Sequence, residues 1–183
     1  MTQPVELILN LFRARGSSMY GGEAVTQLQH ALQAATLARK EKASPALTTA
    51  ALLHDVGHLL HDLPEDAPDS GIDDFHEMLA ARFLEKYFGT EVSEPVRLHV
   101  EAKRYLCTTE TGYMDTLSAS SIQSLTLQGG LMQEDEVRAF EAGPFAKDAV
   151  ALRRWDDLAK DPALPTEPIE AFADDITACL LRS

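Results

Sequence analysis

The chain has 183 residues, a length typical of one domain, and we predict a single domain over residues 1–183. Its net charge of −13 at pH 7 disfavours binding to nucleic acid or to an anionic membrane surface, so neither is an expected partner. No segment reaches the roughly 20 apolar residues of a membrane span, the N-terminus lacks the basic region of a secretory signal, and the two cysteines form no CxxC pair, which together predict a cytoplasmic protein with free thiols.

Helical periodicity dominates the sequence and strand-like alternation is nearly absent, so we predict an all-α helical bundle. Thr2 and Pro4 favour the start of a first helix, and Gly16 favours its end. Ser44 and Pro45 then cap and start a short apolar helix. The helices predicted after the first one cover residues 23–43, 46–53, 75–88, 94–105, 118–127, 133–142, 145–160 and 168–181.

The helix over residues 46–53 is apolar nearly all round, which is typical of the buried centre of a bundle. It leads directly into the pentapeptide His54-Asp55-Val56-Gly57-His58. Polar groups at the end of a core helix need partners, because burying them unpaired is costly. Residues 62–74, rich in acids and turn formers, predict a loop beyond this point.

Histidines and aspartates recur along the chain in an order that suggests a metal site. A single histidine on an apolar helix face is more often a hydrogen-bonded core residue, but a set of such residues favours coordination. Histidine with carboxylate suits iron, manganese and similar ions, and the lack of a cysteine cluster argues against a structural zinc finger. We group the candidate ligands as His30, His54, Asp55 and Asp156 around one metal and Asp55, His76 and His99 around another. Asp55 would bridge two metals, an arrangement compatible with hydrolysis or with redox chemistry.

Four segments outside the set of candidate ligands indicate which protein family the sequence resembles. They are Tyr20-Gly21-Gly22-Glu23-Ala24-Val25-Thr26-Gln27-Leu28-Gln29-His30, His99-Val100-Glu101-Ala102-Lys103-Arg104-Tyr105-Leu106, Gln128-Gly129-Gly130 and Arg153-Arg154-Trp155-Asp156. With the order of histidines and aspartates, they resemble the HD-domain superfamily, most of whose members are phosphohydrolases. The resemblance is strongest to a smaller branch, the HD-domain mixed-valent di-iron oxygenases of the PhnZ/TmpB-like hydroxyphosphonate dioxygenase type. It covers roughly residues 5–160 and implies an HD-type helical bundle.

The resemblance also implies roles for individual residues. Tyr20 would occupy the open site on one iron until substrate arrives, with Glu23 acting beside it, although both residues could simply form a loop and a helix start. Lys103 would pair with the phosphonate, although a lysine can also lie at a solvated helix end. The implied iron ligands are His30, His54, Asp55, His76, His99 and Asp156, and the implied phosphonate contacts are His58, Lys103, Ser121 and Arg153. Arg104 is expected to be structural, and His61 to lie at the surface.

The implied reaction is cleavage of the C–P bond of a 1-hydroxyphosphonate by O2 at two iron ions in a mixed-valent Fe(II)/Fe(III) pair. We favour (1-hydroxy-2-(trimethylammonio)ethyl)phosphonate, giving glycine betaine and phosphate, because the acidic residues 62–74 with Glu23 and Tyr20 could line a pocket for a quaternary ammonium. The alternative for residues 62–74 is a solvated surface loop, which is the commoner explanation of clustered acids. The alternatives are 2-amino-1-hydroxyethylphosphonate, giving glycine, a metal-dependent HD phosphohydrolase, and a non-catalytic HD-like binding module. The resemblance further implies a functional link to an upstream phosphonate hydroxylase.

Overall fold

The computed structural model describes residues 2–60 and 75–182, and over these residues the regular secondary structure is helical, with two isolated β-bridges and no strand. The predicted all-α fold is therefore confirmed. The predicted acidic loop and His61 lie outside the described residues. The elements are α1 (Gln3–Arg15), α2 (Gln27–Lys40), α3 (Pro45–Leu53), η1 (Val56–Leu59), α4 (His76–Leu84), α5 (Thr90–Arg97), α6 (His99–Thr109), η3 (Tyr113–Thr116), α7 (Ala119–Leu127), α8 (Glu134–Glu141), α9 (Ala146–Leu158), η4 (Ile169–Phe172) and α10 (Ala173–Ala178).

Local capping sets where the first helices begin and end. Gly16 ends α1 as predicted, and its N–H donates to the Phe12 carbonyl at 2.7 Å. The second helix begins at residue 27 and not at residue 23. Thr26 caps it, because its hydroxyl accepts from the Gln29 N–H while the Gln29 side chain accepts from the Thr26 N–H. Residues 20–25 are thereby left free to form a loop that reaches the centre of the molecule.

The predicted single helix over residues 94–105 is wrong, because the chain forms two helices with a break at Leu98. At this break the His99 ring donates from Nδ1 to the Val96 carbonyl at 2.7 Å. In a continuous helix that carbonyl accepts from the backbone N–H four residues later. The helix predicted over residues 168–181 is likewise divided into η4 and α10, whereas the other predicted helices occur with ends shifted by at most four residues.

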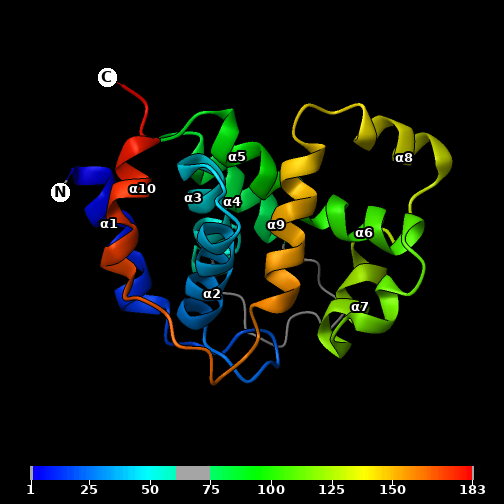
Figure 1. Cartoon of the computed structure of the whole chain (residues 1–183), viewed down its shortest axis with the longest axis horizontal. Coiled ribbons are helices and arrows are strands. Elements are labelled where there is room, and N and C mark those ends of the chain that lie inside the picture. The colour runs from blue at the N-terminus through cyan, green and yellow to red at the C-terminus, as the bar shows by residue number, and fades with distance from the viewer. Residues whose placement is uncertain (1, 61–74, 183) are drawn as a thin grey trace.

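Helix α9 lies between two groups of helices (Figure 1). On one side, α1, α2, α3, α4, α5 and α10 pack with it around the largest apolar cluster, which includes Leu53, Leu84 and Trp155. On the other side, α6, α7 and α8 form two smaller clusters, around Phe140 and around Leu125. The face of α9 between these clusters carries Arg153 and Asp156, and both are buried.

Two further features can be compared with the sequence. Cys107 and Cys179 are free thiols, as predicted. None of the described helices is long and apolar enough to cross a membrane. The assignment of residues 1–183 to one domain stays a prediction.

Candidate metal centre

Six side chains from five helical segments meet in the interior where the helices converge. His30 comes from the first turn of α2, His54 and Asp55 directly follow α3, and Asp156 comes from α9. His76 and His99 are the first residues of α4 and α6. All six are buried, with exposed fractions of 0–8%. They form the two groups predicted from the sequence: His30, His54, Asp55 and Asp156 in the first, and Asp55, His76 and His99 in the second.

Asp55 belongs to both groups through different oxygen atoms. Its Oδ2 lies 3.3 Å from His54 Nε2 and 3.5 Å from His30 Nε2. Its Oδ1 lies 3.4 Å from His76 Nε2 and 3.5 Å from His99 Nε2. One carboxylate can therefore serve two cations at once, which is the bridging arrangement inferred from the sequence.

Three of the ligand histidines also contact a backbone carbonyl through Nδ1, and this contact orients the lone pair on Nε2. Nδ1 of His30 lies 2.9 Å from the Ala159 carbonyl, and Nδ1 of His54 lies 2.9 Å from the Ala51 carbonyl. His99 makes the same contact with Val96. A carbonyl can only accept, so each Nδ1 carries a hydrogen, and each ring in its neutral form presents the Nε2 lone pair to the centre. This is the usual outer arrangement of metal-binding histidines.

The polar atoms of the cluster are arranged to bind a cation, and hydrogen bonds to one another do not satisfy all of them. Nε2 of His30 and Nε2 of His54 lie only 3.0 Å apart, and Nε2 of His76 and Nε2 of His99 lie 3.2 Å apart. Asp55 Oδ1 is buried without a hydrogen-bond donor among the described residues. Such an atom is costly to bury unless a proton or a metal satisfies it. The donor set of imidazole nitrogen and carboxylate oxygen suits borderline first-row metals such as iron.

The charges in the cluster also favour a bound cation. Burial opposes ionisation of Asp55, but the neighbouring His54 and His30 outweigh it and hold the pKa of Asp55 well below its ordinary value. Burial would lower the pKa of His54, yet the charge of Asp55 and a hydrogen bond that His54 donates to Asp156 raise that pKa to about 10. In the absence of a metal, a proton on His54 therefore supplies the positive charge that the carboxylates require. Metal binding would release such protons.

Gly57 explains why the pentapeptide contains a glycine. A Cβ atom at this position would lie 2.0 Å from the backbone oxygen of His76. Only glycine allows η1 to approach the start of α4 so closely. This approach brings His76 to the bridging carboxylate of Asp55.

A loop residue covers the first group. Tyr20 stacks on the His30 ring with centroids 3.7 Å apart, and its hydroxyl donates to Asp156 Oδ1 at 3.3 Å. Burial and the charges of Asp156 and Asp55 raise the pKa of Tyr20 well above its ordinary value. His58 stacks on His76 with centroids 4.1 Å apart, and the centre of its ring lies 6.5 Å from that of Tyr20. Tyr20 and His58 thus both contact the predicted ligands, as their proposed roles require.

Buried cations lie next to the first group. Arg153 Nη1 pairs with Asp156 Oδ2 at 2.7 Å, and its Nη2 lies 3.5 Å from Ser121 Oγ. Lys103 lies in the middle of α6, is 2% exposed and donates to Ser124 Oγ at 2.7 Å. The alternative of a solvated helix end is therefore wrong for Lys103. Burial and the charge of Arg153 lower the pKa of Lys103 to about 7.

The structure adds residues that the sequence analysis missed. Asp157 pairs with Arg153 and also accepts from the Tyr113 hydroxyl. Asp157 lies one helical turn after Arg153, a spacing typical of ion pairs that could have indicated it. Lys160 pairs with Glu23 at 3.1 Å and donates to Ser121 Oγ at 3.2 Å. A lysine just beyond a helix end is usually solvated, so no pattern in the sequence indicates this contact.

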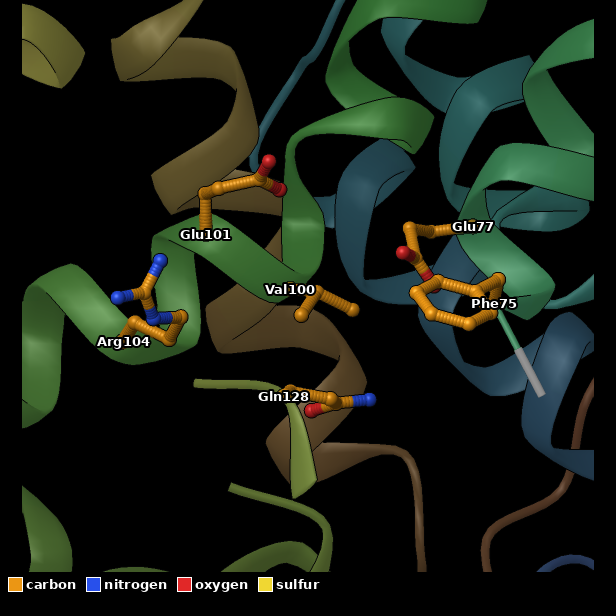
Figure 2. A pocket seen from close by; sticks show the side chains of 6 residues that line it. All are labelled: Phe75, Glu77, Val100, Glu101, Arg104 and Gln128. Carbon is orange, nitrogen blue, oxygen red and sulfur yellow. The ribbon is translucent and has the colours of Figure 1, made fainter. Parts of the chain in front are cut away.

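A small pocket adjoins the second group. It has a volume of about 100 Å³, and Figure 2 shows Phe75 and Glu77 across from Val100 and Gln128. Glu77 and Val100 directly follow His76 and His99 in the sequence. The lining residues are Phe75, Glu77, Val100, Glu101, Arg104 and Gln128. Arg104 donates to the Gly130 carbonyl and to Glu136, and these contacts fit the structural role expected for it.

A helical bundle that buries four histidines and two aspartates in two ligand groups defines an HD-type metal-binding protein. The model of the HD domain matches residues 28–160, and the chain belongs to this family. It is 44% identical over 180 residues to a hydroxymethylphosphonate dioxygenase of Gimesia maris, covering 98% of this chain and 89% of the relative.

Two further relatives cover most of the chain. A [1-hydroxy-2-(trimethylamino)ethyl]phosphonate dioxygenase (glycine-betaine-forming) of Leisingera caerulea is 40% identical over 169 residues, which is 92% of this chain and 86% of the relative. An uncharacterized protein, L432, of Acanthamoeba polyphaga mimivirus is 35% identical over 173 residues, covering 93% and 78%. The predicted resemblance to HD-domain hydroxyphosphonate dioxygenases is confirmed.

Proposed function

We propose that the protein is a dioxygenase that uses O2 to cleave the C–P bond of a 1-hydroxyphosphonate. The observation that carries this proposal is the position of Arg153 and Lys103, two buried cations beside the candidate metal ligands. A dianionic phosphonate placed next to aspartate ligands needs such positive partners. The names of the two relatives called dioxygenases support the same class of reaction.

The six buried ligands would hold two iron ions, with Asp55 shared between them, and the mixed-valent Fe(II)/Fe(III) state is part of the proposal. Bound iron would supply the binding and activation of dioxygen, which no amino-acid side chain provides. The fixed Nδ1 contacts of His30, His54 and His99 would keep their Nε2 atoms aimed at the metals. The outer hydrogen bonds of the chain therefore preorganise the site.

The remaining residues would receive the substrate. Arg153, Ser121, Lys103 and His58 would bind the phosphonate oxygens, and binding of the dianion would favour the charged form of Lys103. The Tyr20 hydroxyl, which lies against Asp156, would give way to the substrate. Glu23 would lie beside the part of the substrate beyond C1. The chain would thus orient the C–P bond and compensate the charge of the phosphonate.

Within this class, we propose (1-hydroxy-2-(trimethylammonio)ethyl)phosphonate as substrate, in agreement with the activity named for the Leisingera caerulea relative. The products would be glycine betaine and phosphate. Hydroxymethylphosphonate is a second candidate. It carries no cation that would need a carboxylate partner, and Glu23 is already paired with Lys160. Either substrate requires an upstream reaction that places a hydroxyl on C1 of a phosphonate. The cytoplasmic location of the protein remains a prediction.

The proposal is tested by incubating the iron-loaded protein in air with three hydroxyphosphonates and identifying the acid formed. Glycine betaine, glycine or formate would identify the trimethylammonio, amino or unsubstituted substrate. Each reaction would consume one O2 and release one phosphate and one proton. Failure to form an acid from any of the three would overturn the proposed function.

A further inference from the structure

The ammonium group of Lys160 is held at the junction of the predicted catalytic and phosphonate-binding residues. Lys160 follows the end of α9, and its side chain is 14% exposed. Its Nζ lies 3.1 Å from Glu23 Oε1, and it donates to Ser118 Oγ at 3.1 Å and to Ser121 Oγ at 3.2 Å. These three contacts use all the donors that an ammonium has.

The same group also faces an aromatic ring. Nζ of Lys160 lies 5.8 Å from the centre of the Tyr20 ring, within the range of a cation–π contact. A carboxylate and an aromatic face together are the groups that a protein uses to bind an ammonium ligand. Here Glu23 and Tyr20 already bind an ammonium, and it belongs to the chain itself.

The carboxylate of Glu23 is held in place by several contacts. Its Oε1 also accepts from the Ser120 hydroxyl at 3.1 Å. Burial raises the pKa of Glu23, but hydrogen bonding from Ser118 and the charge of Lys160 outweigh burial and lower that pKa. The carboxylate is therefore ionised and neutralised by Lys160. A substrate with a cationic tail would have to compete with Lys160 for the same carboxylate.

We propose that Lys160 is a specificity-determining residue whose ammonium competes with the cationic group of a substrate for Glu23 and Tyr20. The inference rests on the proposed function and concerns the selection among hydroxyphosphonates. Substrates that carry no cation, such as hydroxymethylphosphonate, leave the Lys160–Glu23 pair intact. Substrates with an ammonium at C2 bring a second cation to one carboxylate and must displace the first.

The test compares two substrates in the iron-loaded full chain. For each variant, kcat/KM is measured for (1-hydroxy-2-(trimethylammonio)ethyl)phosphonate and for hydroxymethylphosphonate, and the ratio of the two values is taken. In Lys160→Met, which retains the length of the side chain without the charge, the ratio should shift toward the trimethylammonio substrate by about tenfold or more. Lys160→Arg, which keeps the charge, should retain the native ratio.

Two further variants keep the test decisive. Lys147→Met removes an exposed lysine from α9, the helix that precedes Lys160, and should leave the ratio unchanged. Lys160→Gln keeps polar contacts to the serines without a charge, so it should shift the ratio like the methionine variant if that variant folds poorly. A ratio that is unchanged in both uncharged variants, or that falls, would overturn the role of Lys160. Absence of O2-dependent turnover of both substrates by the native protein would instead overturn the proposed function.

Discussion

The hydroxyl of Tyr20 donates a hydrogen bond to Oδ1 of Asp156 across 3.3 Å, while the Tyr20 ring lies flat on His30. A loop residue thus contacts two predicted ligands of the same metal, one through its hydroxyl and one through its ring. Any substrate atom that takes the place of this hydroxyl must break the contact with Asp156. We therefore predict that Tyr20 competes with the substrate for this place beside the first group.

Tyr20→Phe isolates the hydroxyl, because phenylalanine keeps the stacking on His30. The variant should retain the iron content of the native protein and should bind the hydroxyphosphonate more tightly by roughly twofold to tenfold, the value of one hydrogen bond. Binding can be measured by calorimetry under anoxic conditions, which prevent turnover. Loss of iron, or weaker substrate binding, would contradict the role proposed for Tyr20.

Asp55→Asn tests the bridging carboxylate. Asparagine keeps the shape of the side chain but offers one oxygen and no charge, so iron affinity should fall at both positions by at least about 100-fold, more than outer contacts usually contribute. His99→Gln serves as the matched change in the second group alone and should leave the first position able to bind iron. Iron per chain measured after dialysis distinguishes the two. Retention of two ions by Asp55→Asn would show that Asp55 is not shared.

Gly57→Ala should disturb the second group of ligands, Asp55, His76 and His99, although Gly57 is not itself a ligand. The added methyl group would meet the His76 backbone at 2.0 Å, and we expect a loss of about 1–3 kcal/mol in the free energy of unfolding together with weaker binding of one iron. Gly89→Ala is the control, because its methyl group would meet only the flexible side chain of Glu91. If both variants unfold at the same denaturant concentration as the native protein, Gly57 is not required for this close approach.

The buried Lys103 predicts a pH dependence of phosphonate binding. Because its pKa is lowered to about 7, Lys103 carries its charge below that pH and loses it as the pH rises. Affinity for the phosphonate should therefore fall by roughly tenfold or more between pH 7 and pH 9, in line with loss of a charged hydrogen bond. Lys103→Arg keeps the charge throughout this range and should flatten the profile. An equally steep profile in the arginine variant would assign the titration to another group.

The sequence was informative where local rules decide the structure. The start and the end of α1, and the all-α character, follow from apolar periodicity and from Pro and Gly positions. The two ligand groups could be predicted because their residues lie at the ends and buried faces of these helices. The match of both groups with the structure shows how strongly the order of histidines and aspartates constrains such a centre.

Tertiary contacts determined what the sequence could not predict. The break at Leu98 accompanies a contact of the His99 ring with a carbonyl, which local propensity does not describe. The contact of Lys160 with Glu23 joins residues 137 positions apart in the chain, so no local pattern marks it. The start of α2 was predicted too early, although the capping box at Thr26 could have indicated it.

The most direct test of the proposed oxygenase is the dependence of phosphate release on dioxygen. The iron-loaded protein is mixed with a hydroxyphosphonate in air and under strict anoxia, and phosphate, carboxylic acid and O2 are measured in parallel. We predict that phosphate, acid and consumed O2 appear in equal amounts in air and that release stops under anoxia, resuming when O2 is admitted. Undiminished phosphate release under anoxia would contradict the oxygenase and identify the protein as a hydrolase.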